Sequence, residues 1–189
     1  MTTIMEALRL EHANTARLLD LLEYELAKGA DGDFHLVKSI ADYLLTYPDK
    51  YHHPKEDLVY RALLAAEPEE GAPLDDLEAE HIELAERTEE LALAVKRILA
   101  GREEAGPWFE NLTESFIRFY RQHIAKEESG FFLEAERVLD AETFMELESR
   151  VMDVSDPLFD DHAADRLAQL RTGLASAPRP GNAERTTAR

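Results

Sequence analysis

The fold class is decided by residues 74–98, which read LDDLEAEHIELAERTEELALAVKRI. Their apolar side chains recur at intervals of three and four positions, the spacing that brings side chains onto one face of an α-helix. His81 occupies one position of this apolar series, where a hydrocarbon side chain would be easier to bury. We therefore predict a helix from about Leu74 to Ala100 that turns a histidine toward a protein core.

The same helical spacing recurs in three further segments, and no segment shows the sustained alternation of a strand. We predict additional long helices over about 3–28, 34–65 and 107–139, joined by short loops that contain Gly or Pro. Four amphipathic helices with short connections bury their apolar stripes most simply against one another. The sequence therefore predicts an all-α, up-down antiparallel four-helix bundle over residues 1–140.

The segment after this bundle is expected to be less regular. Residues 141–174 predict a C-terminal helical extension, with short helices near 141–151 and 158–174. Residues 175–189 contain Pro and Gly and show no apolar pattern, so we expect a disordered tail there.

Composition restricts the classes of partner and of site. Forty Asp and Glu residues against 21 Lys and Arg give a formal net charge of −19, which repels phosphate backbones and anionic lipid surfaces. We therefore expect no nucleic-acid or membrane partner. Cysteine is absent, which excludes disulfides and thiolate ligands. Because the sequence shows neither a signal-peptide pattern nor a long apolar run, we expect a cytoplasmic protein, whose oligomeric state stays open.

Each of the four predicted helices places a histidine on its core-facing stripe, and two of these stripes add a glutamate one turn later. The six side chains are His12, His52, Glu56, His81, His123 and Glu127. Two carboxylates in one core are unfavourable unless they pair with cations or bind a metal, and the neighbouring stripe positions offer no Lys or Arg. We therefore predict that these six residues are metal ligands. His35 and His162 fall off the apolar faces and are expected to lie outside the site.

Pro54 leaves the role of one further histidine open. A proline inside a helical pattern removes a hydrogen-bond donor and disfavours α geometry in the preceding residue, so either the second helix kinks or a new segment begins near His53. In the second case His53 with Asp57 competes with His52 and Glu56, although the latter pair matches the other stripes better. His53 is then an additional ligand, a hydrogen-bonding neighbour of the ligands, or a helix cap.

The predicted donor atoms are imidazole nitrogens and carboxylate oxygens. Such a set suits Fe, Mn, Zn or Cu, and it is too rich in nitrogen for Mg or Ca. Six side chains exceed the needs of one tetrahedral Zn, but they hold two ions if the carboxylates bridge them. We expect two non-haem Fe ions, with Zn or Mn as alternative metals.

The motifs resemble the hemerythrin-like, or HHE cation-binding, domain family over about residues 1 to 140. They are His12, the run His52-His53-Pro54-Lys55-Glu56-Asp57, the pair Glu80-His81, and the run His123-Ile124-Ala125-Lys126-Glu127-Glu128. The resemblance implies an up-down bundle with a carboxylate-bridged di-iron centre. Members are associated with O2 binding or sensing, NO or peroxide chemistry, iron handling and iron–sulfur cluster repair.

Two departures from the family pattern limit the functional assignment. Oxygen-carrying hemerythrins have a second histidine on the third helix, where this sequence has Leu77 or Ala85, so the resemblance implies one imidazole fewer unless His53 replaces it. Repair members carry an N-terminal cysteine segment, which this chain lacks. Three hypotheses remain: a sensor or carrier of a small diatomic ligand, an enzyme that consumes peroxide, NO or O2, and a metal-free or mononuclear Zn scaffold or regulatory module.

Overall fold

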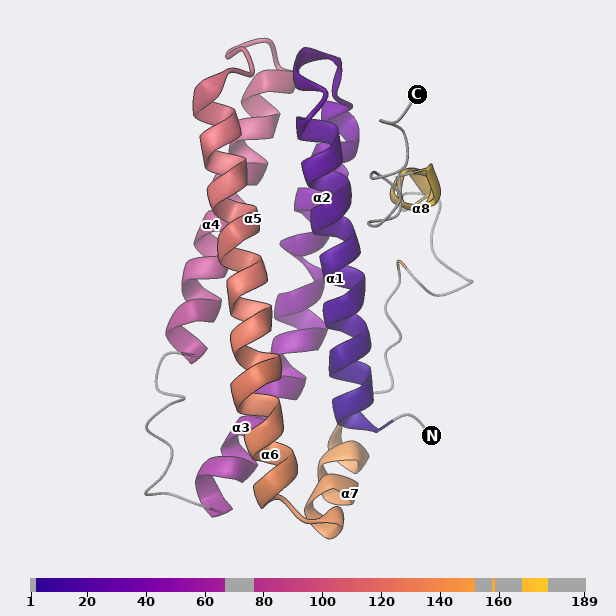
Figure 1. Cartoon of the computed structure of the whole chain (residues 1–189), viewed down its shortest axis with the longest axis vertical. Helices are drawn as coiled ribbons and strands as arrows, with labels where there is room; N and C mark the ends of the chain where they lie inside the picture. Colours follow the sequence, from indigo (N-terminus) through magenta and orange to yellow (C-terminus); the bar gives the residue numbers. More distant parts are fainter. Residues whose placement is uncertain (1–2, 67–76, 152–157, 159–167, 177–189) are drawn as a thin grey trace, which may run out of the picture.

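The computed structural model describes residues 3–66, 77–151, 158 and 168–176, and every regular element in these ranges is helical. The helices of the bundle lie side by side along its long axis (Figure 1). Their bounds are α1 (Ile4–Leu26), α2 (Phe34–Leu44), α3 (His53–Ala66), α4 (Leu77–Leu99), α5 (Pro107–Lys126) and α6 (Phe132–Val138). The predicted all-α bundle is confirmed.

Local signals in the sequence set the ends of α1. The Thr3 side chain accepts a hydrogen bond from the backbone of Glu6, whose carboxylate accepts one from the backbone of Thr3. This reciprocal pair satisfies donors that have no partner inside the helix. The far end is followed by the short turn η1 (Gly29–Asp31), in which Gly29 has φ +60°, a value that glycine adopts without strain.

Two of the predicted long helices are interrupted by a wider turn. The turn η2 (Pro48–His52) separates α2 from α3, and η4 (Glu127–Phe131) separates α5 from α6. The backbone N–H of His53 donates to the carbonyl of Pro48, five residues earlier, and Phe132 donates in the same way to Glu127. Such π-helical turns occur often at functional sites. A new segment therefore begins at His53, which was one of the two expected outcomes.

Apolar side chains fill the bundle in two separate clusters. The larger cluster joins α1, α2, α4 and α5 around residues such as Leu19, Ile40, Leu91 and Phe109. The smaller cluster joins α1, α3 and α6 around residues such as Leu8, Val59 and Phe132. None of the helices in the described ranges is long and apolar enough to cross a membrane.

Two C-terminal helices pack on the outside of this bundle. The helix α7 (Ala141–Arg150) buries Leu147 in the smaller cluster, and α8 (Ala168–Ser176) buries Leu170 in the larger one. The expected helix near 141–151 is confirmed. The later one is described only from residue 168, and it extends to Ser176, two residues into the segment expected to be disordered. Residues 159–167 and 177–189 lie outside the described ranges, so the expected tail and the domain division stay predictions.

Candidate metal centre

Buried polar side chains form a layer between the two apolar clusters. Those at most 8% exposed include Glu11, His12, His52, Lys55, Glu56, His123 and Glu127. They come from α1, η2, α3, α5 and η4, while half-buried His81 comes from α4. All six predicted site residues therefore converge on one layer.

Two histidines face one side of the glutamate pair. The Nε2 atom of His52 lies 3.3 Å from Oε1 of Glu56, and the Nε2 atom of His12 lies 3.5 Å from the same oxygen. The Nε2 atom of His12 also lies 3.2 Å from Oε2 of Glu127. These contacts bring together four buried residues, namely His12, His52, Glu56 and Glu127. One nitrogen or oxygen atom from each lies within 4.8 Å of the corresponding atoms of the other three. We call these four residues the four-residue group.

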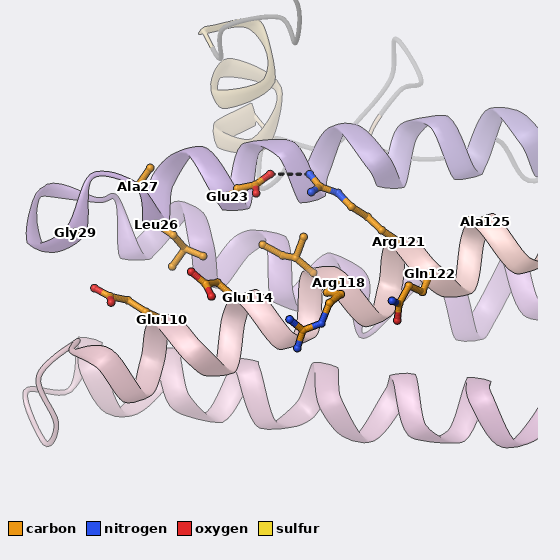
Figure 2. Close-up of a pocket in the computed structure, with 11 residues that line it drawn as sticks. Glu23, Leu26, Ala27, Gly29, Glu110, Glu114, Arg118, Arg121, Gln122 and Ala125 are labelled. Carbon is orange, nitrogen blue, oxygen red and sulfur yellow. Dashed lines mark hydrogen bonds and ion pairs between the residues drawn. The ribbon is translucent and has the colours of Figure 1, made fainter. Parts of the chain in front are cut away.

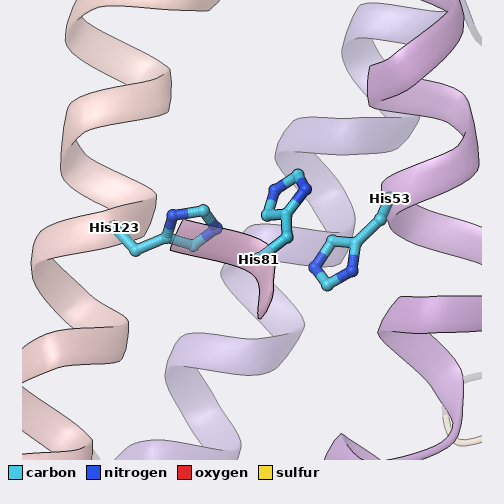
Figure 3. Close-up of side chains that lie close together, drawn as sticks. All are labelled: His53, His81 and His123. Atoms are coloured by element: carbon cyan, nitrogen blue, oxygen red, sulfur yellow. The ribbon is translucent and has the colours of Figure 1, made fainter. Parts of the chain in front are cut away.

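Three histidines face the other side of the glutamate pair. His53, His81 and His123 extend from α3, α4 and α5 toward one another (Figure 3), with ring nitrogens within 4.8 Å of one another. The Nε2 atom of His81 lies 3.4 Å from Oε2 of Glu56 and 3.3 Å from Oε1 of Glu127. The Nε2 atom of His123 lies 3.2 Å from that Oε1. We call His53, His81 and His123 the three-histidine group.

Glu56 and Glu127 each direct one carboxylate oxygen to the histidines of the four-residue group and the other to the three-histidine group. Both carboxylates are at most 1% exposed. Both oxygens of Glu56, Oε2 of Glu127 and Nε2 of His12 accept or donate no hydrogen bond. Buried polar atoms normally have a hydrogen-bonding partner, and orphaned ones point to an ion or water at the site. The unpartnered oxygens and the surrounding imidazoles fit cations bound between the glutamates and the histidines.

The protonation of the site in the absence of metal follows from the same contacts. Burial by itself lowers the pKa of His12, but contacts with Glu127 and Glu56 outweigh it and raise that pKa to about 10. Burial is likewise outweighed at His52 by Glu56 and Glu11, and at His81 by Glu127 and Glu56, and the pKa of each of these histidines rises to about 9. These imidazoles thus hold protons at neutral pH, and a metal ion would have to displace them.

His53 lies on α3 beside His81, the single histidine that α4 brings to the site. Its ring stacks on His81 with the centroids 4.0 Å apart, while Leu77 is buried in the smaller apolar cluster and Ala85 is half-buried. Burial lowers the pKa of His53, which favours the neutral ring that binds metals. Of the three roles considered for His53, its position favours that of a ligand.

Sequence reasoning missed the acidic residues that lie behind the histidines. The Nδ1 atoms of four imidazoles each contact a carboxylate oxygen on the side away from the site. The pairs are His12 with Glu128 at 3.1 Å, His52 with Glu11 at 2.9 Å, His53 with Asp49 at 3.2 Å, and His123 with Glu80 at 3.1 Å. Such partners fix the orientation of an imidazole ligand and increase its basicity. The adjacent pairs Glu11-His12 and Glu80-His81 are visible in the sequence, but each glutamate contacts a histidine of a different helix.

Sequence reasoning also missed a buried cation. Lys55 is 8% exposed and forms an ion pair with Glu11. It lies three positions after His52 and one before Glu56, in the first turn of α3. Its partner is Glu11, so it does not neutralise Glu56 or Glu127.

A surface groove of about 700 Å³ lies elsewhere on the bundle. It runs between α1 and α5 and contains the ion pair of Arg121 with Glu23 (Figure 2). Leu26 and Ile117 contribute apolar surface, and none of the histidines of the buried layer lines it. This groove is therefore separate from the candidate metal centre.

Comparison with known proteins places the chain by its sequence. The model of the hemerythrin HHE cation binding domain matches residues 3–135, which include every residue of both histidine groups. No curated protein and no solved structure gives a significant match. The matched range spans the bundle from the cap of α1 into α6 and excludes α7 and α8. The chain belongs to the hemerythrin HHE cation-binding domain family, and it contains a buried His and Glu cluster suited to a metal.

Proposed function

We propose that this protein binds two non-haem iron ions, one at the four-residue group and one at the three-histidine group. The single observation that carries the proposal is the division of each buried carboxylate. Glu56 directs Oε1 to His52 and Oε2 to His81, and Glu127 directs Oε2 to His12 and Oε1 to His123. A carboxylate offers two oxygens, and so it can bridge two ions.

The donor set favours iron over the alternatives. The four-residue group offers two imidazoles and two carboxylate oxygens. The three-histidine group offers three imidazoles, and it faces the other oxygen of each glutamate. Sites of imidazole and carboxylate with open positions are typical of non-haem iron. When bound, iron would supply redox chemistry and open positions for O2, NO or peroxide. The chain itself holds the imidazoles in place and shields the centre between two apolar clusters.

Anaerobic iron loading tests this proposal. We expect two irons per chain by metal analysis, and a spectrum of the oxidised protein that changes with azide and, after reduction, with NO. Trace iron in the loaded and folded protein, or one tightly bound Zn in its place, would reject the di-iron centre and favour the scaffold hypothesis.

A second experiment separates a carrier from an enzyme. The four-residue group supplies four donors, so an ion bound there would keep open positions, and we propose that these positions react with O2 or peroxide. We therefore expect the reduced protein to autoxidise in air and to consume peroxide or NO over several turnovers. A long-lived oxygenated form that releases O2 under vacuum would support the carrier instead.

A further inference from the structure

Glu11 is a buried carboxylate whose partners come from both sides of the break between α2 and α3. Its Oε2 atom lies 2.9 Å from Nδ1 of His52 in η2, and its Oε1 atom accepts a hydrogen bond of 3.1 Å from the hydroxyl of Tyr47. The ammonium of Lys55, on α3, contacts the same Oε1. Glu11 itself belongs to α1. One carboxylate thus connects α1 to the residue before η2, to η2 itself and to the first turn of α3.

The surroundings of Glu11 make this connection strong. Glu11, Tyr47, His52 and Lys55 are each at most 8% exposed, so water and salt screen their interactions little. The ammonium of Lys55 and the hydroxyl of Tyr47 both contact Oε1 of Glu11, which leaves Oε2 directed at His52. Lys55 compensates a charge that would otherwise be unfavourable in the interior.

The corresponding contacts of the three-histidine group are more exposed. Glu80, which contacts Nδ1 of His123, has a side chain 22% exposed and pairs with Lys126, which is 44% exposed. Asp49, which contacts His53, is 52% exposed. The second imidazole of the four-residue group, His12, contacts Glu128, which is 43% exposed. Of the acids that contact Nδ1 of a described histidine in the site, Glu11 is the most buried, with its side chain 9% exposed.

We propose that Glu11, held by Lys55 and Tyr47, is the positioning residue for the ion at the four-residue group, and that occupancy of this position depends on its charge. This inference rests on the proposed two-ion centre. The four-residue group has fewer imidazoles than its neighbour, so it depends more on the orientation and basicity of each one. A charged partner at Nδ1 supplies both, because it fixes the ring and strengthens Nε2 as a donor.

The test is an anaerobic Co²⁺ titration of Glu11→Gln and of the matched variant Glu80→Gln, both read by ligand-field absorption and calorimetry. Co²⁺ binds N/O sites more tightly than Fe²⁺ and needs no reductant. We expect Glu11→Gln to weaken one of two binding steps by about 10- to 100-fold and to leave the other unchanged. Glu80→Gln should weaken the opposite step. In His81→Ala, the step sensitive to Glu11 should persist.

Gln keeps the shape of Glu11 and removes its charge, so a merely structural role would leave both steps intact. If Glu11→Gln destabilises the metal-free protein, the double variant Glu11→Gln/Lys55→Met is titrated in its place, because it removes both buried charges. Two unchanged steps in Glu11→Gln, or the same step weakened in both single variants, would overturn the inference alone. If the wild-type chain takes up fewer than two Co²⁺ ions and also fewer than two Fe²⁺ ions, the proposed function is overturned instead.

Discussion

The two halves of the bundle differ in what fills their interior. In the half around Phe109 and Leu91, the packed side chains are almost entirely hydrocarbon and aromatic. In the half around Glu56 and Glu127, a layer of imidazoles and carboxylates interrupts the apolar packing, and several of its atoms have no hydrogen bond. Hydrophobic burial provides the main drive for folding, and burying polar groups costs free energy unless they are paired. The first half therefore stabilises the fold, and the second half is specialised for binding.

The first prediction removes the carboxylates of the second half. Because Glu56 and Glu127 each face both histidine groups, Glu56→Ala or Glu127→Ala should weaken binding of both ions by more than about 100-fold, beyond the usual effect of an indirect partner. The metal-free variants should remain folded, since the two apolar clusters provide the main drive for folding. Metal analysis with circular dichroism provides the measurement. Two irons and an unchanged spectrum in both variants would show that these residues are not ligands.

The second prediction removes packing from the first half. Phe109 is 1% exposed and contacts Phe34, so Phe109→Ala should lower the free energy of unfolding by about 3–5 kcal/mol. The number of ions bound per folded chain should stay the same. Urea unfolding of the metal-free protein, followed by metal analysis below the transition, checks both parts. A loss of ions in the fully folded variant would show that the halves are coupled.

The third prediction concerns the pH dependence of the metal-free protein. The pKa values of His12, His52 and His81 lie at about 10, 9 and 9, above the value of about 6.5 in an unfolded chain. The folded state therefore binds more protons, and this contribution to stability is complete below pH 6.5 and disappears as the pH rises through 9 to 10. We expect the melting temperature to fall between pH 7 and pH 10. In the double variant Glu56→Gln/Glu127→Gln, the melting temperature should fall less over this range. An equal fall in the variant and the wild type would show that these carboxylates do not raise the histidine pKa values.

The smallest effect is expected at a histidine outside the buried layer. His35 is exposed in the first turn of α2 and is absent from both histidine groups. His35→Ala should leave iron content unchanged and alter the free energy of unfolding by less than about 0.5 kcal/mol. It serves as the control for every histidine variant, and a loss of iron would mean that the site is wrongly placed.

Local spacing predicted the helical segments and the convergence of the six site residues, but not the wide turns η2 and η4 that interrupt two of the predicted helices. The seam of residues 74–98 and the intervals from His52 to Glu56 and from His123 to Glu127 place side chains on one helical face, whatever the fold. A polar residue on an apolar face must then lie in the core. Helical periodicity carries this information because it relates residues only a few positions apart.

The tertiary structure alone decided how these residues are divided and what supports them. The assignment of His12 with His52 and of His81 with His123 depends on how the helices are rotated against one another. The contacts of Glu11 with His52 and with Lys55 join α1 to η2 and α3, segments about 40 residues away in the chain. Sequence spacing describes one helix at a time, whereas the contacts of a metal centre join atoms from helices whose relative heights and rotations are set by the packing of the whole core.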